Sequence, residues 1–281
     1  MMPIRGLVRD KFTSGSTLKW ILLFMGLFVI LVPFIWMISG SFRPESDLYG
    51  HPASLIPGRF TLHGYRGVWT QLPFLRLLLN TLIFAGSTTV LCLVFDSMCA
   101  YALSRLRFRG KTVAFWMIIA TLMVPFQVTL IPVFIELFHF GWLNSYQGLI
   151  VPRATSAFGI FLLRQFFMSI PTEIDEAARI DGASHFRIYF QIILPLSKPA
   201  LATVAVMNFM SLWNDLLWPL VVTSSSNMLT LPAGLTLFGG SHIIDHAVLL
   251  AGATLSMLPI ALAFLLAQKF FITGIATTGN K

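Results

Sequence analysis

The chain has 281 residues, of which 56% are hydrophobic and 11% are charged, and its mean hydropathy is +0.80. Soluble domains carry about 25% charged residues, so this composition excludes a water-soluble enzyme, a disordered chain and a disulfide scaffold. Cys92 and Cys99 lie seven residues apart in one apolar segment, about 10 Å on a helix, and are expected to stay free thiols. We predict an all-α integral membrane protein.

Six apolar segments are candidates for transmembrane helices, each of which needs about 20 residues. Four of them contain no Asp, Glu, Lys or Arg: 20–42, 77–95, 112–135 and 246–268. Two others, about 148–166 and about 200–222, hold Arg153 and Asp215 respectively. The first segment is too long for the apolar part of a signal peptide, so we expect it to remain in the membrane.

The basic residues predict the orientation. With six spans both termini lie on one side, and fourteen of the 19 Lys and Arg residues then fall on that side. Cytoplasmic segments carry the excess of basic residues, so we expect cytoplasmic N- and C-termini. These residues also meet anionic lipid head groups, which accounts for the formal net charge of +8 without a nucleic-acid partner.

The chain is expected to form one membrane unit in three parts. Residues 1–75 would hold the cytoplasmic N-terminus, the first transmembrane helix and the first outer loop. Residues 76–272 would hold helices 2–6, and residues 273–281 a cytoplasmic tail. A long cytoplasmic loop at about 167–199 is the most strongly patterned stretch of the middle part.

Two motifs that would give the chain chemistry of its own are incomplete. Gly110-Lys111-Thr112 resembles the end of a phosphate-binding loop, but the residue five positions before Gly110 is not the Gly that this loop needs. His242 and His246 with Asp245 could hold a metal, but Ile243 stands where a zincin has its catalytic Glu. We expect no enzymatic activity, no metal and no cofactor in this chain.

The 167–199 loop has the pattern of a helix, a tight corner and a second helix. Thr172 and Asp175 resemble a capping box at the start of the first helix. Gly182 suits the left-handed residue that ends such a helix. A second helix would begin at Ser184 and end at Pro195, which has no backbone donor.

The first of these helices has the surface of a docking element. Ile174, Ala177 and Ala178 form a narrow apolar stripe whose small residues permit close approach. Glu173 and Glu176 add an acidic rim, whereas helices that lie on a membrane surface are usually basic. We therefore expect the helix to bind a cytoplasmic protein, with an interfacial helix lying on lipid as the alternative.

The same loop resembles the EAA signature of binding-protein-dependent ABC importer permeases. The pattern is filled at Glu176-Ala177-Ala178, Gly182, Ile192 and Leu194-Pro195. Three further stretches are similar to sugar-importer permeases, close to the second permease of maltose-type systems: Ala100–Arg105, Trp213–Asp215 and Thr230–Pro232. The resemblance runs from about residue 80 to the C-terminus and does not identify the sugar.

The resemblance implies a type I importer fold, a bacterial or archaeal cytoplasmic (inner) membrane and a set of partners. A second permease would pair with this chain, two ATPase subunits would dock on the cytoplasmic loops and bind the ATP and magnesium, and an extracytoplasmic binding protein would deliver the cargo. Glu176 is expected to pair with a basic ATPase residue. The residues implied in coupling are Glu176, Ala177, Ala178, Asp181, Gly182, Ile192, Leu194 and Pro195.

Polar residues of the fifth span predict a substrate pathway. At 100° per residue one helix face carries Asn208, Ser211, Asp215 and Trp218. Amide, carboxylate and aromatic groups suit the hydroxyls and the apolar face of a sugar, and a polar helix–helix contact is the alternative. Because this face offers Asp215 and no basic residue, a neutral cargo is preferred over an anion such as a glycerol phosphate.

Two further charges inside predicted spans are costly to bury. Asp96 is expected chiefly to be satisfied by neighbouring helices, and Arg153 to extend its long side chain to the outer interface. Besides a sugar-importer permease, a stand-alone secondary transporter and a structural or signalling membrane protein remain open. A secondary transporter favours inverted repeats and no acidic docking loop, so the importer is the preferred interpretation.

Overall fold

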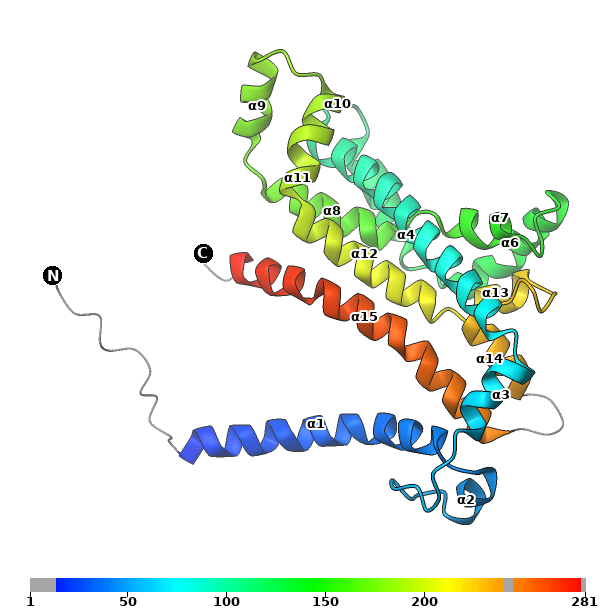
Figure 1. Cartoon of the computed structure of the whole chain (residues 1–281). Helices are drawn as coiled ribbons and strands as arrows, with labels where there is room; N and C mark the ends of the chain where they lie inside the picture. Colours follow the sequence, from blue (N-terminus) through cyan, green and yellow to red (C-terminus); the bar gives the residue numbers. More distant parts are fainter. Residues whose placement is uncertain (1–13, 240–244, 279–281) are drawn as a thin grey trace. The chain divides into compact units, whose positions relative to one another are not determined.

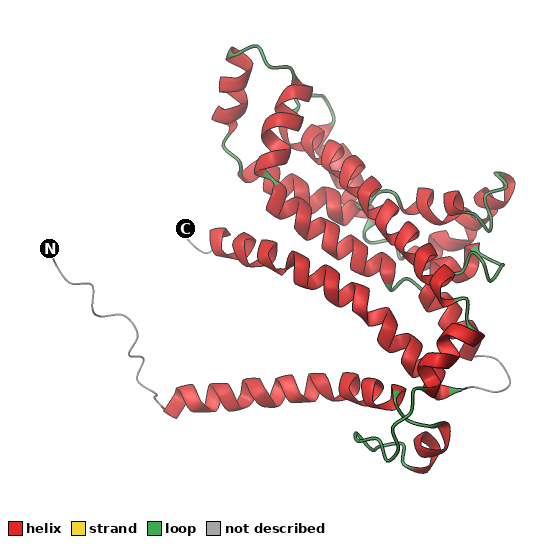
Figure 2. Cartoon of the chain, in the orientation of Figure 1, coloured by secondary structure: helices red, strands yellow, loops and turns green. Residues whose placement is uncertain are grey.

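The computed structural model describes residues 14–239 and 245–278, and every regular element among them is a helix (Figure 1 and Figure 2). In chain order the helices are α1 (Ser14–Ser41), α2 (Glu45–Gly50), α3 (His63–Gln71), α4 (Phe74–Arg105), α5 (Lys111–Thr121), α6 (Phe126–His139), α7 (Tyr146–Ile150), η1 (Val151–Arg153), α8 (Ala157–Ser169), α9 (Thr172–Ile180), α10 (His185–Ile188), η2 (Tyr189–Ile193), α11 (Leu194–Leu196), α12 (Lys198–Trp213), α13 (Leu217–Val222), α14 (Leu231–Gly239) and α15 (His246–Thr278). Of the two η elements, η1 is a 3-10 turn and η2 a π-helix. The all-α prediction is confirmed.

Three of the described helices are long and apolar enough to cross a membrane alone: Leu18–Ser41 of α1, the whole of α4, and His246–Leu265 of α15. Two pairs have the composition of a span but are bent, α5 with α6 by 96° and the α10–α11 segment with α12 by 77°. Helix α8 is apolar and has 13 residues. Within the described residues there are thus three to five candidate spans.

Two of the predicted spans are interrupted. The 112–135 segment breaks between α5 and α6, because Pro125 disfavours helical backbone at the residue before it. The 200–222 segment breaks between α12 and α13, which leaves Asp215 on irregular backbone. Irregular backbone at membrane depth is tolerated where it is buried in protein or lines a water-filled cavity. These breaks are therefore candidate places for a transport pathway.

The described residues fall into two compact units, one holding the chain up to Val68 with Asp245–Thr254, the other holding the rest. In the first unit, one fully buried arginine organises the loop after α1. Arg43 Nε donates to Asp47 Oδ2 at 2.7 Å, and its Nη atoms donate to the carbonyls of Asp47, His51 and Ser54. The guanidinium holds the pKa of Asp47 below its ordinary value through this hydrogen bond.

The start of α15 is tied to the same loop. His63 Nε2 lies 2.8 Å from Asp245 Oδ2, and His246 Nδ1 lies 2.8 Å from Glu45 Oε1. Asp245 and His246 are thus engaged with the loop rather than with each other, and His242, their partner in the rejected metal motif, lies outside the described residues. These pairings account for Asp245 and His246 without a metal.

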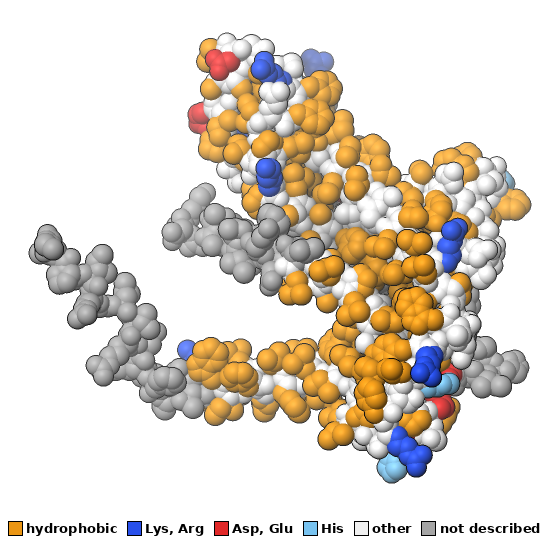
Figure 3. Space-filling model, in the orientation of Figure 1, with side chains coloured by type: hydrophobic (Ala, Val, Ile, Leu, Met, Phe, Trp, Pro, Cys, Tyr) orange, Lys and Arg blue, Asp and Glu red, His pale blue; other side chains and the backbone are white. Residues whose placement is uncertain are grey.

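Helix α1 exposes apolar side chains along its length, and Figure 3 shows them on one face. Trp20, Phe24, Phe28 and Ile30 are each more than half exposed. In water such a surface would be unfavourable, whereas lipid hydrocarbon solvates it. This pattern supports a membrane location for α1.

Helix α4 is the central helix of the second unit and packs along both α8 and α12. A buried apolar core, here called the α4 core, joins these helices to the α10–η2 segment and includes Ala100, Tyr101, Leu163, Phe167, Ile188, Ile193 and Val204. Nearer the other end of α4, the buried amide of Asn80 donates to the carbonyls of Asn227 and Leu229, both at 2.8 Å. These two bonds fix the loop before α14 to α4.

Candidate coupling helix and membrane cavity

Helix α9 is the first helix of the predicted docking loop and follows α8 after two residues (Figure 1). It begins directly after Pro171, and no side chain caps its first turn. The prediction of a Thr172–Asp175 capping box is therefore wrong. The carboxylate of Asp175 turns instead toward the end of α4, where it meets a buried arginine.

Arg105, the last residue of α4, joins three elements in what we call the Arg105 cluster: Arg105, Asp175 and the carbonyls of Phe167 and Ile170. Arg105 Nε lies 3.3 Å from Asp175 Oδ2, and the two side chains are 3% and 8% exposed. Arg105 Nη2 donates hydrogen bonds of 2.7 Å to both carbonyls, at the end of α8. Arg105 thus contacts both α9 and the segment just before α9. These contacts fix the position and direction of α9.

The side chains of α9 divide into an inner and an outer set. Ile174 and Ala178 are half-buried and pack against the α4 core. Glu173, Glu176 and Ala177 are exposed. The predicted apolar stripe is therefore divided: Ile174 and Ala178 face the core, and Ala177 faces outward. Ala177 and Glu176 remain open to a partner.

The corner after α9 has the predicted geometry. Asp181 is the exposed C-cap, and Gly182 has a φ of +78°. The Gly182 N–H donates to the Arg179 carbonyl at 3.0 Å and the Ala183 N–H to the Ala178 carbonyl at 2.9 Å. These two bonds make a Schellman motif, which needs the left-handed residue that glycine adopts without steric cost. The predicted helix end at Gly182 is confirmed.

The second helix of the loop begins as predicted, with Ser184 as the N-cap of α10. It does not end at Pro195 but runs through η2 and α11 to Leu196. The π-helical η2 lies just before Pro195, and such bulges let a helix absorb an irregular hydrogen-bond pattern. Ile192 and Leu194 are half-buried against the α4 core, and Pro195 is exposed.

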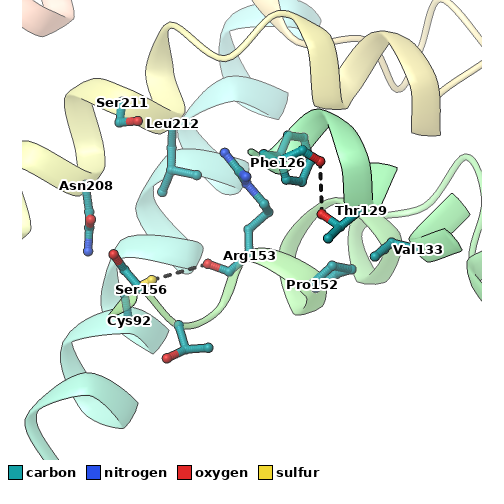
Figure 4. Close-up of a pocket in the computed structure, with 11 residues that line it drawn as sticks. Cys92, Phe126, Thr129, Val133, Pro152, Arg153, Ser156, Asn208, Ser211 and Leu212 are labelled. Carbon is teal, nitrogen blue, oxygen red and sulfur yellow. Dashed lines mark hydrogen bonds between the residues drawn. The ribbon is translucent and has the colours of Figure 1, made fainter. Parts of the chain in front are cut away.

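A cavity of about 260 Å³ lies among α4, α6, η1 and α12 (Figure 4). Its lining comprises Cys92, Phe126, Thr129, Val133, Pro152, Arg153, Thr155, Ser156, Asn208, Ser211 and Leu212. Two of the four residues of the predicted substrate face, Asn208 and Ser211, are thus present. Asn208 Nδ2 is buried and has no hydrogen-bond partner among the described residues.

Arg153 lies in the wall of this cavity, as Figure 4 shows. Its Nη2 donates to Asp215 Oδ2 at 2.9 Å, and its guanidinium carbon lies 4.3 Å from the centre of the Phe126 ring. A carboxylate and an aromatic face thus hold the Arg153 side chain within the protein. The premise that the Asp215 face has no basic neighbour is wrong, because Arg153 is that neighbour.

Trp218 does not belong to the cavity. Its side chain is fully buried, and its indole N–H donates to the Leu149 carbonyl at 3.0 Å. The predicted shared face assumed one continuous helix, but the helix is interrupted between Trp213 and Leu217, so the helical spacing does not carry over to Trp218. Asp215 Oδ1 instead accepts from the backbone N–H of Trp218 at 3.2 Å, which helps to start α13.

Asp96 is fully buried, and neighbouring elements satisfy its Oδ1, whereas its Oδ2 has no hydrogen-bond partner among the described residues, so the expectation holds for one of the two oxygens. Asp96 Oδ1 accepts from Thr155 Oγ1 at 2.7 Å and from the Ser156 N–H at 3.0 Å, and both of these residues line the cavity. Cys92 and Cys99 are free thiols. Among the described residues, no group of three or more His, Cys, Asp or Glu side chains could hold a metal ion.

Residues 93–276 match the family described as the binding-protein-dependent transport system inner membrane component. The chain belongs to this family of ABC importer permeases. It is accordingly a multi-pass inner-membrane subunit of a bacterial importer that works with a binding protein, and it is not the catalytic subunit. The alternatives of a stand-alone transporter and a signalling protein are thereby set aside.

Similar proteins support this assignment along nearly the whole chain. Probable ABC transporter permease protein YurM of Bacillus subtilis is 35% identical, covering 97% of this chain and 91% of that protein. The arabinooligosaccharides transport system permease protein AraQ of Halalkalibacterium halodurans is 33% identical, covering 96% and 99%. A chain in the crystal structure of a bacterial ABC transporter involved in the import of the acidic polysaccharide alginate has a TM-score of 0.83 at 26% identity, covering 95% and 100%.

The Arg105 cluster predicts a specific effect of Asp175→Ala. Loss of the carboxylate leaves the buried Arg105 charge unpaired, which should cost about 3–5 kcal/mol in local stability. Helix α9 should then open more often, and trypsin should cut faster after Arg179. Glu173→Ala is the matched control, because Glu173 is exposed on the same helix. Equal cleavage rates in the two variants would show that the cluster does not hold α9.

The corner predicts that position 182 accepts Asn better than Val. No atom lies within 4 Å of a Cβ built there, so the cost of a side chain comes from the positive φ alone. Valine at such a φ should cost about 1–3 kcal/mol, whereas asparagine tolerates it. Uptake by reconstituted complexes should therefore fall for Gly182→Val and remain near wild type for Gly182→Asn. Wild-type uptake with Gly182→Val would contradict a role for the corner in aiming α9.

Proposed function

We propose that this chain is one of two permease subunits in a type I importer, with six transmembrane helices and cytoplasmic N- and C-termini. The short α8 and the two bent pairs would complete the three straight spans. Residues 76–272 would form the permease core, flanked by parts 1–75 and 273–281. Two ATPase subunits would bind the ATP and magnesium, so this chain itself needs no cofactor.

Helix α9 is proposed to be the coupling helix that docks on an ATPase subunit. The observation that carries this proposal is the Arg105 cluster, which holds α9 rigidly against α4 and α8 while Glu176 and Ala177 stay exposed. Movement of a docked ATPase would then act directly on two helices of the permease core. Such rigid-body transmission is the kind of motion that alternating access needs.

The cavity is proposed to form part of the pathway for a neutral saccharide or polyol. Arg153, Asn208 and Ser211 supply hydrogen-bonding groups to its wall, and Asp215 neutralises the charge of Arg153. The second candidate is an anionic cargo of the glycerol-phosphate type. It is favoured by the presence of Arg153 and by the 35% identity to the sn-glycerol-3-phosphate permease protein UgpE of Pectobacterium atrosepticum. The ion pair makes the neutral cargo the better match.

The coupling proposal is tested by comparing Glu176→Ala with Glu173→Ala. If Glu176 pairs with a cation in a desolvated groove, its loss should cost about 2–5 kcal/mol of association free energy. Glu173, nearer the start of the helix, should contribute only about 0–1 kcal/mol. The measurement is the amount of ATPase retained on purification, with substrate-stimulated hydrolysis as a second readout. Small and equal effects would show that the acidic rim is merely solvated.

The proposed orientation is tested by thiol labelling in a variant whose two native cysteines are replaced by alanine. A cysteine at exposed Ser226, beside Ser225, should react with a membrane-impermeant reagent added outside the cell. A cysteine at Ser184, in the coupling loop, should react only after the membrane is opened. The reverse pattern would overturn the orientation and place α9 on the wrong side for an ATPase.

The neutral-cargo proposal predicts a change of selectivity in Asp215→Asn. This variant leaves the Arg153 charge uncompensated in the cavity wall, so binding should shift toward anions by about tenfold or more relative to neutral sugars. The measurement is equilibrium binding of a neutral and a uronic disaccharide to the assembled complex without binding protein. The double variant Arg153→Gln, Asp215→Asn is the control and should regain the neutral preference. Unchanged selectivity in the single variant would remove the cavity from the pathway.

A further inference from the structure

A second, smaller pocket lies beside α9, on the side that faces the end of α4. It has a volume of about 190 Å³ and is lined by Ser104, Arg105, Leu106, Arg107, Lys111, Thr172, Asp175, Glu176 and Arg179. Four of these side chains are basic and two are acidic. Figure 3 shows acidic and basic side chains close together at this end of the second unit.

Some of these charges are already satisfied within the chain. Arg105 and Asp175 form the buried ion pair of the Arg105 cluster. Lys111 Nζ donates to the carbonyls of Ser104 and Leu106, at 2.9 and 3.1 Å, and so closes the C-terminal end of α4. Three of the six charged side chains, Arg105, Asp175 and Lys111, therefore have structural roles within this chain.

The other three charged side chains lie at the exposed rim of the pocket. Arg107, Glu176 and Arg179 are all exposed, and none forms an ion pair with another described residue. Arg107 comes from the loop after α4 and Arg179 from the last turn of α9. Two guanidinium groups from different elements that border one small pocket suit a carboxylate, which guanidinium binds in a bidentate manner.

We propose that this pocket is a second docking point for the ATPase, which inserts an acidic side chain between Arg107 and Arg179. The inference rests on the proposed role of α9 and extends it. A subunit seated on Glu176 and Ala177 covers the mouth of the pocket, because Glu176 belongs to both surfaces. The ATPase would thus present a basic side chain to Glu176 and an acidic side chain to the two arginines. Two ion pairs of opposite polarity would fix the position in which the ATPase docks.

The phosphate of an anionic lipid is the competing occupant, since basic pockets on the cytoplasmic side of membrane proteins attract such head groups. Glu176 argues against it, because a carboxylate in the same lining repels a phosphate that cannot offer a compensating cation. A protein surface can offer both signs in fixed positions. We therefore assign the pocket to the ATPase.

The test compares Arg107→Glu and Arg179→Glu with Arg109→Glu in the complete importer. Arg109 is exposed on the same loop and does not line the pocket, so its reversal controls for the general change of charge. The readouts are the ratio of ATPase to permease after affinity purification over a range of salt concentrations, and the bound lipids by native mass spectrometry. Each pocket reversal should lower ATPase retention about tenfold or more, and the control less than twofold.

The outcomes separate this inference from the proposed function. Equal retention in all three arginine variants overturns the second docking point, and a simultaneous loss in Glu176→Ala leaves the coupling role of α9 standing. Full retention in Glu176→Ala as well would overturn both. Loss of an anionic lipid from the two pocket variants, with the ATPase retained, would assign the pocket to lipid and also overturn the inference.

Discussion

The buried ion pair between Arg105 and Asp175 is the interaction on which the position of α9 depends. Desolvating two charges is unfavourable, and their attraction offsets this only when further hydrogen bonds satisfy the groups. The carbonyls of Phe167 and Ile170 provide such bonds to Arg105 Nη2 at 2.7 Å, whereas Asp175 Oδ1 has no hydrogen-bond partner among the described residues and depends on the ion pair alone. The pair therefore contributes little net stability but selects one arrangement of α4, α8 and α9, since any other arrangement leaves a charge buried and unpaired.

This selection matters because α9 has little else to hold it. It has nine residues, and its apolar contact with the α4 core is made through Ile174 and Ala178. A helix this short is marginal without tertiary support. The Arg105 cluster and the glycine corner at Gly182 supply that support from either end of the helix, so that the exposed Glu176 is presented in a fixed direction. The proposed docking of an ATPase needs this rigidity, because a loose helix would absorb the motion of its partner.

The same physical logic recurs at the membrane cavity. Arg153 and Asp215 come from two irregular segments, η1 and the break between α12 and α13, and their ion pair holds these segments together. Asp96 stabilises the adjacent wall through Thr155 and Ser156. Charged side chains and irregular backbone are costly inside a membrane unless they are buried in protein or line a water-filled cavity. Their concentration around one cavity is the reason for proposing a pathway there.

Features that depend on neighbouring residues could be predicted from the sequence, whereas contacts between residues far apart in the chain could not. Apolar run lengths located the long helices, and Gly182 located the corner, because both signals act within a few residues. The role of Asp175 was misread as a cap because its partner lies 70 positions earlier in the chain, at Arg105. The Trp218 prediction failed because a helix face cannot be extrapolated across a break. The Ala100–Arg105 stretch, noted only as a similarity, was the one available sign that Arg105 matters.

The most direct test of the central claim is site-specific photo-crosslinking from α9 in the assembled importer. A photoreactive amino acid at Ala177, which is exposed beside Glu176, should yield a covalent adduct between the permease and the ATPase subunit. The same probe at Ser226, in the loop proposed to lie outside, should yield none. An adduct from position 177 that disappears when Asp175 is also replaced by alanine is the expected result. Absence of any ATPase adduct at position 177, with an intact complex, would contradict the assignment of α9 as the coupling helix.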